Sequence, residues 1–270
     1  MELTQIKFDI SDEIATITLN RPEARNALSQ EMRVEFDHVL AEVRRKAGEE
    51  VKAVILTGAG GAFSAGGDVK GMRGRAETPA EGRDRMRAAQ SRLHAIINLE
   101  LPLIVVVDGA AAGAGCNLAL AGDFILATPK SFFLQAFGRI GLVPDWAGFF
   151  LLPRIVGLQR AKELVFSARR LPADEAKSLG IVYAIHSPET IMAEARKLAG
   201  RFRHASQTAI ALSKNALNQS FNLDLHATLE LEAYGQAIAR TTDYHRQAVA
   251  RFGDKQPSLF DWEAMDRAGK

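Results

Sequence analysis

The sequence is poor in several features that define whole classes of protein. It has one cysteine, Cys116, among 270 residues, so an internal disulfide is excluded and a reducing compartment is expected. No apolar run approaches the roughly 20 residues needed to span a bilayer. The first residues show neither a signal-peptide nor a transit-peptide pattern. We therefore expect a cytoplasmic protein with no membrane partner.

The sequence also lacks a large excess of charge of either sign. The formal net charge is +2, and no block of Lys and Arg exceeds two or three residues, which argues against a nucleic-acid partner. We also expect no metal site. Apolar residues make up 47% and charged residues 24%, as in an ordinary globular protein that buries a sizeable core.

Strands and helices alternate through the first two thirds of the chain. Helices are expected over about 30–46, with Ser29 as the cap, and over about 80–99 and 113–121. This alternation predicts an α/β fold with crossover connections. The strands are expected at residues 4–9 and 13–19, with a turn at Ser11-Asp12, and at 51–57, 103–107 and 123–127.

The chain changes character beyond about residue 188. No strand is expected there, and the periodicity predicts helices over 191–203, 208–219, 223–241 and 244–252. The third of these carries more apolar residues than one solvent-facing helix needs. These residues can pack on their own domain or form a subunit contact, and the pattern alone leaves both open.

Two buried strands run into loops made largely of Gly and Ala. They span residues 51–68 and 103–116. Loops so depleted of side chains leave backbone N–H groups as the available chemistry, and two such loops can hold an oxyanion between main-chain donors. Glycines that merely end strands are the ordinary alternative. Two loops of this kind in one chain favour a functional pocket.

A series of motifs in register makes the chain resemble the crotonase (enoyl-CoA hydratase/isomerase) superfamily, and the resemblance covers essentially the whole sequence. The motifs are Asn20-Arg-Pro-Glu-Ala-Arg-Asn-Ala-Leu28, Phe63-Ser-Ala-Gly-Gly-Asp68, Gly109-Ala-Ala-Ala-Gly-Ala-Gly115, Ile140-Gly-Leu-Val-Pro-Asp145, Leu152-Pro-Arg-Ile-Val-Gly-Leu-Gln-Arg-Ala-Lys-Glu163, Leu171-Pro-Ala-Asp-Glu-Ala-Lys-Ser-Leu-Gly-Ile-Val182 and Ala250-Arg-Phe-Gly-Asp-Lys-Gln-Pro-Ser-Leu-Phe260.

The resemblance implies a spiral of β-β-α turns over residues 1–195 and a helical trimerisation region over 196–270. It implies a homotrimer or a hexamer formed by two trimers. The implied substrate is an acyl-CoA thioester, which brings coenzyme A to the site without any separate cofactor. The backbone N–H groups of Gly67 and Ala114 correspond to the oxyanion hole, which stabilises an enolate in this family.

Two departures from the family pattern bear on the reaction. The hydratases that this chain resembles use two glutamates, and those positions hold Asn117 and Phe137. An asparagine exchanges no proton at useful pH, and a phenylalanine has no polar atom. A two-glutamate hydratase is therefore not expected.

Asp145 has two interpretations. An aspartate before an apolar run is a favoured helix N-cap, here for a helix beginning with Trp146. The resemblance to ring-1,2-epoxyphenylacetyl-CoA isomerase-like and Δ3,Δ2-enoyl-CoA isomerase-like proteins instead makes Asp145 the catalytic acid. Neighbours Phe137, Trp146, Phe149 and Phe150 would raise its pKa by desolvation, which suits a proton carrier. The resemblance thus favours double-bond isomerisation of an enoyl-CoA, with the acyl group and the pathway (fatty-acid or aromatic degradation) open.

Two alternatives remain. Aroyl-CoA dehalogenase-like relatives use an aspartate at this motif position as a nucleophile, and His94 is a candidate for the histidine that assists them. A CoA-binding homologue without catalysis is the other alternative.

Further candidates surround the motifs. Arg25, Lys70 and Arg73 can meet the phosphates of coenzyme A or be ordinary solvated charges. Phe252 and Lys255 can reach coenzyme A in a neighbouring subunit. Asp68 is more suited to fixing its loop than to touching substrate, and Cys116 to a buried structural role. The predicted substrate-binding set is Arg25, Ala65, Asp68, Lys70, Phe137 and Trp146.

Overall fold

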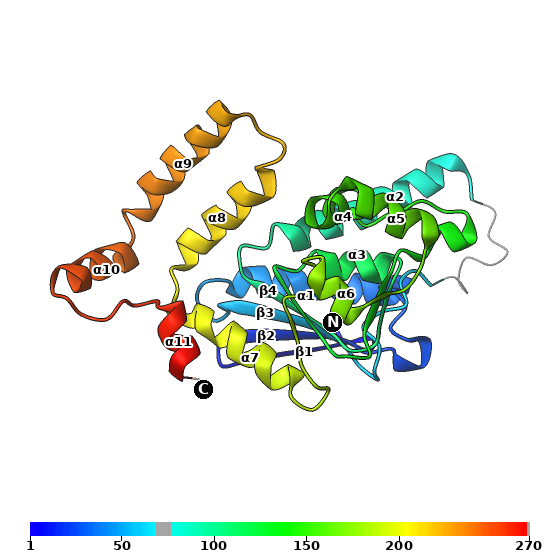
Figure 1. Cartoon of the computed structure of the whole chain (residues 1–270), viewed down its shortest axis with the longest axis horizontal. Helices are drawn as coiled ribbons and strands as arrows, with labels where there is room; N and C mark the ends of the chain where they lie inside the picture. The colour runs from blue at the N-terminus through cyan, green and yellow to red at the C-terminus, as the bar shows by residue number, and fades with distance from the viewer. Residues whose placement is uncertain (69–76, 269–270) are drawn as a thin grey trace.

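The computed structural model describes residues 1–68 and 77–268 and is built around a six-stranded sheet (Figure 1). The strands lie in the order β1 (Ile6–Ser11), β2 (Ile14–Leu19), β3 (Ala53–Gly58), β4 (Leu103–Val107), β6 (Phe124–Ala127) and β9 (Ala184–Ile185). Among the described strands of this sheet, only the pair β1–β2 is antiparallel. A second sheet consists of β5 (Ala110–Ala112), β7 (Phe132–Leu134) and β8 (Leu171–Pro172). The α/β prediction is confirmed.

Helices cover both faces of the large sheet. On one face, α7 (Ile191–Arg201) packs against side chains from β2, β3, β4 and β6. On the other face lie α1 (Gln30–Lys46), α2 (Pro79–Ile97) and α3 (Ala114–Leu120). All five residues of β4 are buried, because a parallel strand between two helical layers has no solvent face. This explains why the central strands read as continuous apolar runs.

Helix α1 forms as its sequence predicts. The Ser29 hydroxyl accepts the Met32 N–H, and the apolar stripe from Met32 to Val43 is buried. Burial of each large apolar side chain contributes about 1.5–3 kcal/mol to the free energy of folding. The helix also buries Glu35, whose carboxylate accepts hydrogen bonds from the N–H groups of residues 4–6 and from the Thr4 hydroxyl. These bonds tie the N-terminal strand to α1.

The remaining elements of the core follow β7. They are the 3-10 helix η3 (Ala136–Ile140), α4 (Gly148–Val156), α5 (Leu158–Ser167) and α6 (Ala173–Ser178), with short 3-10 turns η1 (Pro22–Ala24) and η4 (Phe202–His204) elsewhere. The predicted turn at Ser11-Asp12 is one residue early. Ser11 still belongs to β1, and the left-handed pair Asp12 and Glu13 makes the turn.

Three C-terminal helices extend away from this core (Figure 1). They are α8 (Gln207–Gln219), α9 (Leu225–Ala239) and α10 (Asp243–Gly253), and the latter two bury no residue. We call them the helical arm. At its base, the Lys214 ammonium donates to the Asp123 carboxylate (2.6 Å) and to the Leu101 carbonyl (3.0 Å).

The chain then returns to the core. The sequence pattern missed α11 (Trp262–Ala268), whose Trp262 ring packs against Phe124 and Phe202. The predicted boundary at residue 195 falls inside α7, a helix that covers the sheet. Within residues 1–68 and 77–268, no helix is long and apolar enough to cross a membrane.

Candidate active site

The two glycine-rich loops meet where β3 and β4 end. These strands are parallel neighbours, so their carboxyl ends open at the same edge of the sheet. Backbone hydrogen bonds join the loops: Phe63 and Ser64 donate to the Ala110 carbonyl, and Ala112 donates to the Ser64 carbonyl. The Ser64 hydroxyl adds a bond to the Asn26 carbonyl at 2.7 Å. The predicted juxtaposition of the loops is therefore present.

Glycine is required where the loops touch. Gly66 has a φ of +90°, and a Cβ there would lie 2.5 Å from the Ala112 carbonyl oxygen. A Cβ on Gly115 would lie 2.6 Å from the Ser64 side chain. Any side chain at either position would push the loops apart.

The N–H groups of Gly67 and Ala114 lie at this contact. Gly66, which precedes one donor, comes so close to the other that its Cβ would lie 3.1 Å from the Ala114 nitrogen. In the described part of the chain, neither N–H donates to a protein acceptor. Two backbone N–H donors that lie in adjoining loops and have no acceptor can bind one oxygen atom.

Asn117, on α3, is fully buried and uses its amide for structure. Its Nδ2 donates to the Asp145 carbonyl oxygen at 2.7 Å, and its Oδ1 accepts from Gln135 Nε2 at 2.7 Å. Gly148 packs so closely on this amide that a Cβ would lie 2.4 Å from Nδ2. The side chain at one hydratase glutamate position therefore holds the segment before α4 in place.

Asp145 is not a helix cap, and that prediction is wrong. Helix α4 begins at Gly148, after two left-handed residues, Trp146 (φ 48°) and Ala147 (φ 54°). The predicted helical start at Trp146 is wrong for the same reason. The chain makes this turn to bury the Trp146 ring, which is 3% exposed and part of the main core. The carboxyl of Asp145 is thus released from helix capping.

The Asp145 carboxyl is half-buried and lacks a full set of hydrogen-bond partners. In the described structure its Oδ1 has no hydrogen-bond partner. Burial raises the pKa of Asp145 above its usual range, while the positive charges of Arg33 and Arg85 act in the opposite direction. A desolvated carboxyl with a raised pKa is suited to taking up and returning a proton.

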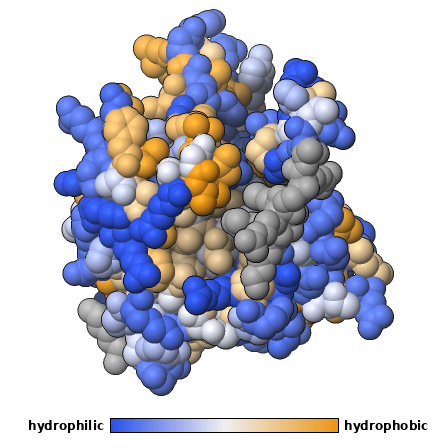
Figure 2. Space-filling view, turned by 90° about the vertical axis from the view of Figure 1, so that its right-hand side faces the viewer, coloured by the Kyte–Doolittle hydropathy of each residue, from blue (hydrophilic) through white to orange (hydrophobic). Residues whose placement is uncertain are grey.

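The four aromatic residues predicted to surround Asp145 differ in their burial. Phe137 and Trp146 are buried, and a Cβ on Gly113 would lie 3.9 Å from the Phe137 ring. Phe149 is 61% exposed, which does not favour its predicted part in desolvating Asp145. Phe150 lies under the Arg154 guanidinium, 3.5 Å from its ring centroid. Hydrophobic residues gather in the middle of the face that Figure 2 shows, surrounded by hydrophilic ones.

Three of the predicted binding residues lie around the first glycine loop. Arg25 is exposed, and its carbonyl accepts the N–H of Ala65, which is exposed as well. The Asp68 carboxylate pairs with Arg21 Nη1 at 2.7 Å, which fixes the end of the loop. Lys70 and Arg73 lie outside the described residues.

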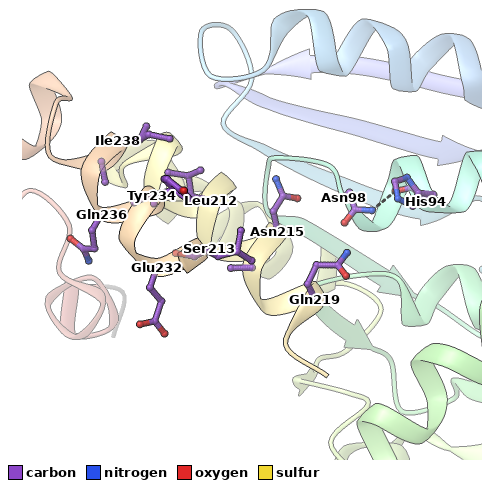
Figure 3. Close-up of a pocket in the computed structure, with 15 residues that line it drawn as sticks. His94, Asn98, Leu212, Ser213, Asn215, Gln219, Glu232, Tyr234, Gln236 and Ile238 are labelled. Carbon is purple, nitrogen blue, oxygen red and sulfur yellow. Dashed lines mark hydrogen bonds between the residues drawn. The ribbon is translucent and has the colours of Figure 1, made fainter. Parts of the chain in front are cut away.

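His94 and Cys116 are not brought into reactive positions. His94 is exposed and lines a cavity of about 700 Å³ between α8, α9 and the end of α2 (Figure 3). Cys116 is buried, and burial raises the pKa of its thiol to about 12. Phe252, at the end of the helical arm, is 87% exposed.

Sequence reasoning missed the arginines that act on Asp145. Arg33 lies on α1 beside the buried Met32, and Arg85 lies on the Arg-rich helix α2. A charged residue on an amphipathic helix is ordinarily solvated, so the pattern gave no signal. It also missed the bond from Asn117 to Asp145, because these residues are distant in the sequence.

Comparison with known proteins agrees with this geometry. Residues 9–263 match the family model described as enoyl-CoA hydratase/isomerase. A probable enoyl-CoA hydratase of Rhodobacter capsulatus is 36% identical over 96% of this chain and 99% of its own. The 1,2-epoxyphenylacetyl-CoA isomerase of Escherichia coli is 34% identical over 92% and 94%.

Solved structures extend the likeness to the fold. The crystal structure of an enoyl-CoA hydratase/isomerase from Cupriavidus metallidurans has a TM-score of 0.91 and 38% identity, and covers 96% of this chain and 97% of that one. The fold is thus that of the crotonase superfamily, as the sequence motifs imply. The chain belongs to the enoyl-CoA hydratase/isomerase family.

Proposed function

We propose that the protein isomerises the double bond of an enoyl-CoA thioester, with Asp145 as the acid and base. The observation that carries this proposal is the half-buried Asp145 carboxyl: its Oδ1 is buried with no hydrogen-bond partner in the described structure, and desolvation raises its pKa. The backbone of Asp145 is held by Asn117 of α3, the helix that begins at the second glycine loop.

The reaction requires one carboxylate and one oxyanion site. The thioester oxygen of a 3-enoyl-CoA accepts from the N–H groups of Gly67 and Ala114. Asp145 removes a proton from C2, and the electrons pass into a dienolate whose negative oxygen these donors stabilise. The protonated Asp145 then returns the proton to C4, which leaves the double bond between C2 and C3. The aspartate ends as it began.

Hydration is disfavoured by what occupies the two glutamate positions. The Asn117 amide is used by Asp145 and Gln135, and Phe137 is a buried hydrocarbon ring. Neither can activate or position water. Excluding water instead protects the dienolate from competing protonation.

The dehalogenase alternative loses its assisting histidine. His94 is exposed on the side of α2 that faces the helical arm. Isomerisation needs no such residue.

We further propose that the helical arm forms the contact between subunits of a homotrimer or hexamer. Large apolar side chains are exposed along α8 and α9, among them Leu217, Leu225, Leu229 and Tyr234. Tyr234, together with Leu231 and Ile238 of the same helix, also lines the cavity of about 700 Å³ in Figure 3. A surface this apolar is stabilised when a second copy covers it.

Rates on two substrates test the proposed activity. We expect the purified protein to convert a 3-enoyl-CoA into the 2-enoyl-CoA, followed by the absorbance of the conjugated product. Hydration of crotonyl-CoA should be at least ~10²-fold slower than in a two-glutamate relative assayed in parallel. Efficient hydration without isomerisation would overturn the proposal.

A further inference from the structure

The motif at residues 20–28 is not used in the reaction proposed above, but its end runs beside the first glycine loop. The Leu28 N–H donates to the Gly66 carbonyl oxygen at 2.8 Å. Leu28 and Gly67 also pair as an isolated parallel β-bridge. We call residues 25–28 the strap. It is the part of the chain that contacts the peptide group of one oxyanion donor.

The bond from Leu28 fixes the direction of that donor. The Gly66 carbonyl and the Gly67 N–H belong to one planar peptide group, in which the C=O and N–H bonds point in opposite directions. Because Leu28 holds the carbonyl oxygen, the Gly67 N–H points away from the strap. A carbonyl that accepts a hydrogen bond also polarises its own peptide group and makes the N–H a stronger donor. The position of the strap therefore sets both the direction and the strength of the Gly67 N–H.

Asn26 holds the strap in place. It is fully buried and lies in the left-handed region (φ 55°), which asparagine adopts more readily than most residues. Its Nδ2 donates to the carbonyl oxygens of Ala59 (2.8 Å) and Ala62 (2.7 Å), and its Oδ1 accepts the Arg21 N–H at 2.8 Å. One side chain thus joins the turn before the strap to the start of the loop that carries Gly67.

Ser64 connects the strap and the loop a second time. Its hydroxyl donates to the Asn26 carbonyl oxygen at 2.7 Å and accepts the Gly66 N–H at 3.1 Å. The side chain is fully buried, and a Cβ on Gly115 would lie 2.6 Å from it, so it has little room to change rotamer. Gly66 is therefore held at its N–H by Ser64 and at its carbonyl by the strap.

The second oxyanion donor is held in a different way. The Ala114 N–H shares a peptide group with the Gly113 carbonyl, which accepts the Asn117 N–H at 3.1 Å in the first turn of α3. A helix fixes its own first peptide groups through such bonds. The direction of the Ala114 N–H thus follows from α3, whereas that of the Gly67 N–H depends on the strap.

We propose that Asn26 is a positioning residue for the oxyanion hole, which acts through the strap on the N–H of Gly67. The contact of that N–H with the thioester oxygen rests on the proposed function. A misplacement of about 1 Å in a catalytic site can lower the rate roughly 10²-fold. A displaced strap should therefore weaken stabilisation of the enolate more than it weakens binding of coenzyme A.

The carbonyl stretch of a bound thioester tests the proposal without any reaction. Hexanoyl-CoA labelled with carbon-13 at its carbonyl has no double bond to move, and hydrogen bonds to the carbonyl oxygen lower its stretching frequency. We expect infrared difference spectra to show this lowering on the wild-type protein and to show part of it lost in Asn26→Ala and Ser64→Ala. An equal lowering in the wild type and in both variants would overturn the proposal.

Kinetics on a 3-enoyl-CoA give the size of the effect. We expect kcat to fall about 10- to 10²-fold in Asn26→Ala and by less in Ser64→Ala, while KM and the affinity for free CoA change by less than about twofold. Ser64→Ala removes a single atom and serves if Asn26→Ala does not fold. The double variant should lose less than the product of the two single effects, since both side chains act on one peptide group. Weakened CoA binding with an unchanged kcat would overturn the proposal.

Glu35→Gln is the matched control for general loss of stability. Glu35 is also buried in α1, and its carboxylate accepts the N–H groups of residues 4–6, in and before the edge strand β1. This variant should be less stable than the wild type, yet keep the carbonyl stretch and kcat. If it changes both as much as Asn26→Ala does, the effect is one of stability and the proposal fails.

The wild-type spectrum separates this proposal from the proposed function. If the bound thioester shows no lowered stretch, the Gly67 N–H does not contact its oxygen and the role of Asn26 is refuted, whatever reaction the protein catalyses. If the stretch is lowered in the wild type and less so in Asn26→Ala, but no double bond moves, isomerisation fails and the positioning role of Asn26 is supported.

Discussion

The starts of α3 and α4 lie side by side. Each helix follows a turn with positive φ, but the two turns use different residues and leave the neighbouring polar side chain in different states. At α3 the chain turns on Gly113, and the following asparagine, Asn117, has both amide atoms satisfied. At α4 the chain turns on Trp146 and Ala147, which are strained in the left-handed region, and the Asp145 carboxyl is left incompletely bonded. In the first case polar groups are used for stability. In the second, strain and an unsatisfied acid persist, which is the pattern expected of a functional group.

The largest expected effect tests whether the acid at α4 is the working group. Asp145→Asn keeps the size of the side chain and the backbone bonds to Asn117 and Gly148, but removes the titratable proton. We expect isomerisation of a 3-enoyl-CoA to fall about 10²–10⁴-fold with little change in CoA affinity. Steady-state kinetics and calorimetry measure the two quantities. An unchanged rate would mean that another group carries the proton.

The next effect tests whether Asn117 is structural. Asn117→Ala leaves the Asp145 carbonyl and the Gln135 amide unpaired in a fully buried place, and should lower the free energy of unfolding by about 1–3 kcal/mol. Asn117→Asp keeps the acceptor for Gln135 but replaces the donor to residue 145 with a buried carboxyl group, so this variant should be less stable than the wild type as well. If denaturant unfolding shows both variants to be as stable as the wild type, the structural role of the Asn117 amide is contradicted.

A pH series sharpens the comparison further. Because burial raises the pKa of Asp145, kcat/KM should fall on the acid side at a pH above the usual aspartate range. A group whose folded pKa is raised costs stability once pH exceeds its unfolded pKa, since the folded state then holds the ionised form unfavourably. Asp145→Asn should therefore be more stable than the wild type at neutral pH, and this advantage should vanish in acid. A constant difference across the pH range would show that Asp145 is not desolvated.

The smallest effect concerns the strain itself. Ala147→Gly removes the cost of a left-handed alanine and should raise the free energy of unfolding by about 1 kcal/mol, with activity retained. Ala41→Gly, at an exposed right-handed position inside α1, should lower it by about the same amount. Two changes of the same sign would mean that Ala147 is not strained.

The same two helix starts show what a sequence can reveal. Both glycine loops and the helix after Gly113 were predictable, because their conformation depends on glycines that the sequence displays. The start of α4 was not, because its turn depends on burying Trp146 and on the Asn117 amide, both of which are tertiary contacts. The local sequence does not distinguish an aspartate that caps a helix from one whose carboxyl is left without a capping role. Arg33 was missed for a related reason, since helical periodicity does not distinguish a solvated arginine from one turned toward a neighbouring element.

The buried thiol of Cys116 gives the chain a practical property. With a pKa of about 12 and only 3% exposure, this cysteine resists alkylating reagents at neutral pH, and it is the only one in the sequence. The native chain therefore needs no removal of Cys116 before a cysteine is introduced elsewhere for labelling. A single cysteine introduced on the helical arm will take up a spin label or fluorophore at one known position, and distances between labels will report how copies of the chain are arranged in solution.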